Sequence, residues 1–135
     1  MFGWGVGETA TITTLAVKVY TAYKDAPDNY RHISNEVESL QILINRAVRH
    51  IEGPMLSDSD QAEGRNVLKG CQGILLDLNS LIEEYNSLAS TNPGQVFRRV
   101  EFGGEDIATL RSRLISNTVL LNGFTQRFDN LMGYY

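Results

Sequence analysis

The side chains that could carry chemistry in this sequence are few and scattered. Zinc sites need clustered Cys and His at tight spacing, whereas Cys71, His32 and His50 stand far apart along the chain. Cys71 falls on an apolar stripe, so we expect a packed core thiol rather than a reactive one. We expect both histidines at surface or boundary positions. The sequence therefore predicts no metal site and no cofactor.

The acidic residues do not form a catalytic pair either. Three neighbouring pairs could be considered for acid–base chemistry: Glu36 with Glu38, Glu83 with Glu84, and Glu105 with Asp106. Residues one or two apart do not share a helix face, so none of these pairs is a carboxylate dyad by itself. The glycines near the N-terminus match neither the dinucleotide fingerprint nor the P-loop, since no Lys-Ser or Lys-Thr follows them. We expect no enzyme.

Asn117 is the one polar residue in an otherwise apolar seam. A buried Asn can fix the register of packed helices at a cost in stability. Alternatively, the seam drifts around the helix because 3.6 residues per turn does not divide seven, which would leave Asn117 near the edge of the interface. The sequence leaves both interpretations open.

Length and charge restrict the class of protein. The chain has 135 residues, 42% hydrophobic and 21% charged, which suits one globular domain. Its net charge of −4 argues against a nucleic-acid partner. Five arginines after residue 92 make the C-terminal part basic, while residues 54–92 are acidic. We expect these two segments to pair inside the fold; an anionic partner for the arginines is the alternative.

The elements that must position these residues are helices. Apolar residues recur at alternating spacings of three and four, which is the pattern of an amphipathic helix. The sequence predicts an all-α, antiparallel up-down bundle in one domain spanning residues 1–135, because short connections favour antiparallel neighbours. The expected elements are a flexible arm over 1–7, four principal helices over about 9–24, 28–52, 58–91 and 104–131, and a short helix near 96–102.

The N-terminal segment also has features of a membrane element. Aromatic residues sit in the arm, and residues 9–23 are apolar apart from threonines, tyrosines and Lys18. About fifteen helical residues fall short of the ~30 Å hydrocarbon thickness, so a core helix of the bundle is the competing interpretation. The membrane-interaction candidates are Phe2, Trp4, Val6, Ile12, Leu15 and Val19.

Several stretches carry a resemblance to a known family that covers essentially the whole chain. They are the N-terminal arm, Ser39-Leu40-Gln41, Phe97-Arg98-Arg99-Val100, and Gly104-Glu105-Asp106-Ile107-Ala108-Thr109-Leu110-Arg111-Ser112-Arg113-Leu114. The chain resembles the helical N-terminal domain of fungal NLR-like (STAND) proteins, a group similar to the HeLo and HeLo-like cell-death domains.

The resemblance implies a regulated effector of programmed cell death in heterokaryon incompatibility and innate immunity. In that scheme, the domain is the N-terminal part of a longer multidomain receptor. Oligomerisation frees the first helix, here residues 1–24, for membrane targeting, and the protein moves from the cytoplasm to the plasma membrane. The expected partners are further copies of the chain, other receptor domains and membrane lipid. A helical protein–protein interaction (adaptor) module without membrane activity is the alternative.

Overall fold

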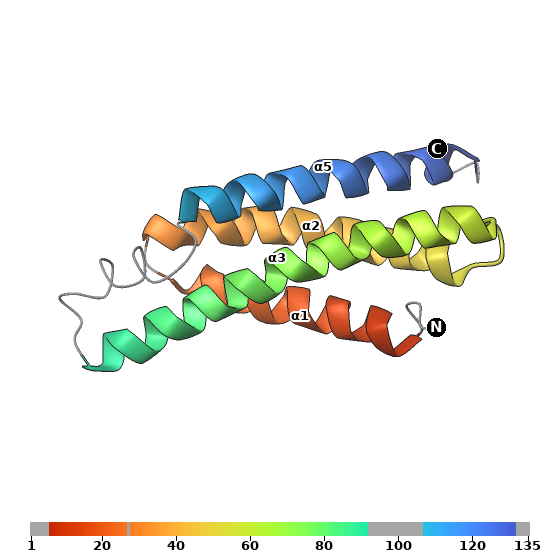
Figure 1. The fold of residues 1–135 in the computed structure, drawn as a ribbon. Coiled ribbons are helices and arrows are strands. Elements are labelled where there is room, and N and C mark those ends of the chain that lie inside the picture. Colours follow the sequence, from red (N-terminus) through yellow and green to blue (C-terminus); the bar gives the residue numbers. More distant parts are fainter. Residues whose placement is uncertain (1–5, 27, 92–106, 132–135) are drawn as a thin grey trace.

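The computed structural model describes residues 6–26, 28–91 and 107–131, with side chains described at 9–26, 30–87 and 107–129. The prediction of an all-α helical bundle is confirmed, since four helices and no strand occupy this part of the chain (Figure 1). The helices are α1 (Val6–Lys24), α2 (Asp28–Glu52), α3 (Asp58–Thr91) and α5 (Ile107–Leu131).

The observed bounds agree with the predicted ones for α2 and α3 and differ at the start of α1. α1 begins at Val6, so Val6 and Gly7, expected in the flexible arm, belong to its first turn. The described part of α5 begins at Ile107. Residues 104–106 and the short helix expected near 96–102 lie outside the described residues. Ser57 caps α3: its hydroxyl accepts a bond from the amide of Asp60 at 3.1 Å.

The helices form a four-cornered bundle. α1 packs against α2 and α3, and α5 packs against the same two helices, so α1 and α5 occupy opposite corners. Thr9, near the start of α1, bonds to Glu52 at the end of α2, while Tyr30, near the start of α2, contacts Tyr85 near the end of α3. These contacts place the start of α1 near the end of α2, and the start of α2 near the end of α3 (Figure 1).

Two glycines in α3 let it approach its neighbours closely. A Cβ on Gly64 would lie 2.6 Å from Cζ of Phe124 and 2.9 Å from Cδ1 of Ile51. A Cβ on Gly70 would lie 2.7 Å from Oδ1 of Asn117. These glycines therefore sit where α3 meets α5 and α2, and α3 continues through them from Asp58 to Thr91.

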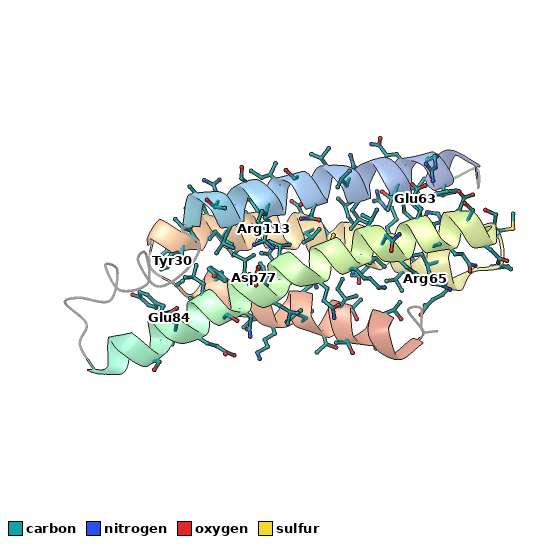
Figure 2. All side chains as sticks on the ribbon, viewed as in Figure 1. Tyr30, Glu63, Arg65, Asp77, Glu84 and Arg113 are labelled. Atoms are coloured by element: carbon teal, nitrogen blue, oxygen red, sulfur yellow. The ribbon has the colours of Figure 1, made fainter. Side chains whose placement is uncertain are left out.

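Two arginines of α5 pair with carboxylates of α3. Arg113 reaches Asp77 of α3 at 2.8 Å, and both are labelled in Figure 2. Arg127 reaches Glu63 of α3 at 3.0 Å. Internal pairing between the acidic and the basic segment is therefore what the structure shows for these two arginines. Such exposed pairs contribute about 0–1 kcal/mol each, so they add little to the stability of the bundle.

Candidate functional site

α1 is an integral part of the core along its inner face. Its buried stripe follows the spacing four, three, four, as the sequence predicts for a core helix. Its members are fully buried against α2 and α3: Ile12, Ala16, Val19 and Tyr23. The sequence left a core helix and a membrane element open for this segment. In the folded bundle α1 is a core helix, because its stripe belongs to the same core cluster as the long helices.

Tyr23 anchors the end of α1. Its hydroxyl donates a hydrogen bond to the backbone carbonyl of Leu78 in α3 at 2.7 Å. Burial, with a smaller effect of Tyr30, raises the pKa of Tyr23 far above the usual tyrosine value, so the hydroxyl keeps its proton and remains a donor. The Tyr23 ring meets Tyr30 edge-on at 6.2 Å, and Tyr30 meets Tyr85 edge-on at 5.4 Å. A chain of three rings thus joins α1, α2 and α3.

The threonines of α1 are accommodated by local hydrogen bonds. The Thr9 hydroxyl is buried and donates to Oε2 of Glu52 at 2.9 Å, which fastens the start of α1 to the end of α2. The Thr13 hydroxyl donates back to the carbonyls of Thr9 and Ala10 in its own helix. Hydroxyls bonded in this way need no solvent, so threonine is compatible with a helix that is part of a core.

The outer face of α1 is mostly uncharged. A shallow, open hollow on this face is lined by Ala10, Thr11, Thr14, Leu15 and Lys18. On the same helix, the side chain of Val17 is 48% exposed. Lys18 reaches Glu83 of α3 at 3.6 Å, but both side chains are exposed, so solvent weakens the pair. The helix therefore presents hydroxyls and small apolar groups outward while burying larger apolar groups inward.

The predicted membrane-interaction residues fall into three groups. Ile12 and Val19 are fully buried in the core, and Leu15 is partly buried against it. Val6 begins α1, but its side chain lies outside the described residues, as do Phe2 and Trp4. The structure thus does not bring these six residues together on one exposed face, because the stripe that contains Ile12 and Val19 faces α2 and α3.

Asn117 lies half-buried where α5 meets Gly70 of α3. Its side-chain amide donates to the carbonyl of Arg113 in its own helix at 2.8 Å. Because the Asn117 side-chain donor finds its acceptor within α5, Asn117 needs no polar partner across the interface. That geometry favours the edge position over a buried register-fixing Asn.

The expectation that His50 lies at a surface or boundary position is wrong. The structure buries His50, and its Nε2 lies 2.7 Å from Oδ1 of Asp129 in α5, while Arg46 reaches the other carboxylate oxygen at 3.7 Å. The reason is that α5 covers the side of α2 next to its apolar stripe. Only the contact with α5 identifies His50 as a buried residue; His32, in contrast, is exposed as expected.

The described residues hold no cluster of three or more His, Cys, Asp or Glu arranged for a metal ion. Cys71 is fully buried on the apolar stripe of α3, as its position in the sequence predicts. Burial raises the pKa of the Cys71 thiol to about 12, so at neutral pH it is protonated and a poor nucleophile. This thiol therefore behaves as a packing group in the folded state.

The length and hydropathy of the helices bear on whether any of them could span a membrane. Within the described residues, none of the helices combines the length and the apolar character needed to cross a bilayer.

Comparisons with models of protein families, with curated proteins and with solved structures found no match to this chain. The candidate site is the outer face of α1, which is identified by its open hollow and by the exposed side chain of Val17.

Proposed function

We propose that this chain is the effector domain of a fungal NLR-like receptor of the kind that contains HeLo-like domains. In this proposal it is the N-terminal part of a longer protein and is cytoplasmic at rest. On activation it self-associates, moves to the plasma membrane through α1, and causes programmed cell death. The resemblance described above suggests this role, and the character of α1 is the structural observation that supports it.

The supporting observation is that α1 is apolar or hydroxyl-bearing around most of its circumference. Inward it carries Ile12 and Val19, and outward it carries Thr14 and Val17, with Lys18 as the charged residue at the centre of its length. A surface helix of a soluble bundle usually has a charged outer face. A helix whose outer face is mostly uncharged, as that of α1 is, can exchange its place in the bundle for an apolar environment, whether a lipid surface or another copy of itself.

The proposal requires that α1 leave its site only when activated, and its burial provides that control. Re-exposing Ile12 and Val19 costs about 1.5–3 kcal/mol for each side chain, and the Tyr23 hydrogen bond adds to this cost. The sum is a substantial fraction of the ~5–15 kcal/mol that stabilises a typical domain. The released state is therefore rare in a single molecule, and oligomerisation must supply the missing free energy.

The test is dye release from liposomes. The protein is concentrated on phosphatidylcholine vesicles, with and without anionic lipid, through a C-terminal histidine tag and a nickel-chelating lipid. Deleting residues 1–24 is a poor variant because it would uncover the core faces of α2 and α3. We use Val17→Glu instead, which places a charge on the exposed outer face of α1 and leaves the core intact.

Ile42→Glu is the matched control, since Ile42 of α2 has a similarly exposed side chain on another helix. We expect the unaltered protein and Ile42→Glu to release dye, and Val17→Glu to do so at least about fivefold more slowly, because a charge on α1 opposes transfer into lipid. No release by any of the proteins, or equal release by Val17→Glu and the unaltered protein, would contradict the proposal.

An adaptor module is the second candidate, and the burial of Ile12 and Val19 favours it. An adaptor would use the folded bundle as it stands and bind another helical domain without moving α1. Saturable binding of such a domain in the absence of lipid, combined with no dye release, would select the adaptor function.

A further inference from the structure

The exposed side of α5 differs in chemistry from the exposed sides of the other helices. We call the exposed positions from Ala108 to Gln126 the α5 outer face. Three large apolar side chains stand on it: Ile115 is 48%, Val119 64% and Leu120 61% exposed. Figure 1 shows α5 along one edge of the bundle, with none of the other described helices beyond it.

The α5 outer face carries no charged side chain. The charged residues of α5 before Arg127 are Arg111 and Arg113, and both are directed to neighbouring helices. Arg111 forks onto the carboxylate of Glu36 in α2, with its Nε at 3.1 and 3.2 Å from the two oxygens. Arg113 pairs with Asp77 of α3. These ion pairs turn the charges toward the flanking helices and leave apolar and small polar groups outward.

Each of the other described helices exposes charge along its length, whereas the exposed charged residue of the described part of α5, Arg127, lies beyond the α5 outer face. Lys18 and Lys24 are exposed on α1, Glu38 and Arg49 on α2, and α3 carries several exposed acids and a lysine. A partner that approached the α5 outer face with a charged surface would lose hydration of its charges and gain no ion pair. The occupant that fits is therefore an apolar, uncharged helix face, and the chain itself supplies one.

We propose that the α5 outer face is a self-association surface, and that its occupant is the same face of a second copy related by a two-fold axis. A two-fold interface brings the same patch of both copies together, so a patch without charge meets no like charge across it. This inference rests on the proposed function, because it assigns the self-association step to a surface separate from α1. Self-association through the α5 outer face involves no lipid.

The size of the surface predicts a weak dimer. From Ala108 to Gln126 the helix is about 28 Å long and about 10 Å wide, so each copy offers on the order of 300 Å² along α5 itself. A stable interface buries about 800 Å² on each partner. We therefore expect association that depends on concentration, with a dissociation constant in the micromolar range or weaker, which suits a domain whose assembly is controlled.

The first experiment is sedimentation equilibrium without lipid, from micromolar to about millimolar protein. Val119→Lys puts two like charges into the interface, and we expect it to raise the dissociation constant at least about tenfold. Ile42→Lys is the matched control: Ile42 is 55% exposed on α2, outside the α5 outer face, and its substitution should leave the constant unchanged. Because both side chains are largely exposed, both variants should fold, as circular dichroism would verify.

The second experiment locates the two-fold axis by disulfide formation. The one native thiol, Cys71, is buried, so an added surface cysteine is the reactive one. Ser116→Cys lies near the middle of the α5 outer face and should form an intermolecular disulfide on mild oxidation. Ser80→Cys, exposed on α3, is the control and should react at least about tenfold more slowly.

A protein that stays monomeric over the whole concentration range overturns the proposal. So do equal effects of Val119→Lys and Ile42→Lys, or equal disulfide rates at the two cysteines. Since no lipid is present, any of these results leaves the dye-release assay to decide the proposed function separately.

Discussion

The glycines of α3 allow a sharp test of how the bundle is packed. In a helix interior, alanine is favoured over glycine by about 1 kcal/mol, so Gly→Ala should stabilise α3 wherever a methyl group has room. Gly64 has no such room: the new Cβ would lie 2.6 Å from Cζ of Phe124 and 2.9 Å from Cδ1 of Ile51. Gly73 has nothing within 4 Å of its Cβ position. The same substitution should therefore have opposite effects at the two sites.

The magnitude follows from these contacts. Both distances at Gly64 are shorter than real Cβ contacts allow, and the atoms belong to buried side chains of α5 and α2. Overpacking of this kind costs about 1–3 kcal/mol. With two contacts from two helices we expect about 3 kcal/mol, reduced to about 2 by the gain in helix propensity. Gly73→Ala should instead stabilise the protein by about 0.5–1 kcal/mol.

The assay is urea and thermal unfolding followed by circular dichroism at 222 nm. For a domain of this size, 1 kcal/mol corresponds to roughly 3–4 °C in Tm. We expect Gly64→Ala to lower Tm by about 6–8 °C and Gly73→Ala to raise it by about 2–4 °C. If Gly64→Ala is as stable as the unaltered protein, or if both variants lose the same stability, the close packing of α3 at Gly64 is wrong.

Three further predictions concern the buried side chains of Tyr23 and Cys71. Tyr23→Phe removes the hydrogen bond to the Leu78 carbonyl and should lower the free energy of unfolding by about 1–2 kcal/mol in urea titrations; an unchanged value would contradict the buried bond. The Cys71 pKa is raised from about 9 to about 12, so the stability due to this thiol should be full below pH 9 and decline as pH rises toward 12. At pH 8, a thiol reagent should modify Cys71 at least about a hundredfold faster in urea than in the folded protein; comparable rates would refute its burial.

Much of the fold could be predicted because helical periodicity is a local property of the chain. The alternating spacing of apolar residues predicted α2 and α3 with the bounds that the structure gives. The cap at Ser57 is equally local, since its hydroxyl accepts a bond from the amide of Asp60 in the same helix. These features need no knowledge of what the helix packs against.

The candidate site was less predictable because it depends on which neighbours each helix has. The residues of α1 suggested either a core helix or a membrane element, and the contact with α2 and α3 places Ile12 and Val19 inside. His50 was expected near the surface, since a single stripe defines one buried face, and α5 covers a second one. The sequence predicted that C-terminal arginines pair with the acidic segment, as Arg113 does with Asp77, but not that Arg111 pairs with Glu36 of α2.

By itself, the sequence determined that the chain forms long amphipathic helices, because the spacing of apolar residues depends on the backbone of each helix alone. Only the tertiary structure decided what the special residues do. Gly64 and Gly70 cost helix stability in isolation, yet they become the points where α3 approaches its neighbours. Burial, close approach and ion pairing join residues far apart in the chain, so they are fixed by how the helices pack and not by any local pattern.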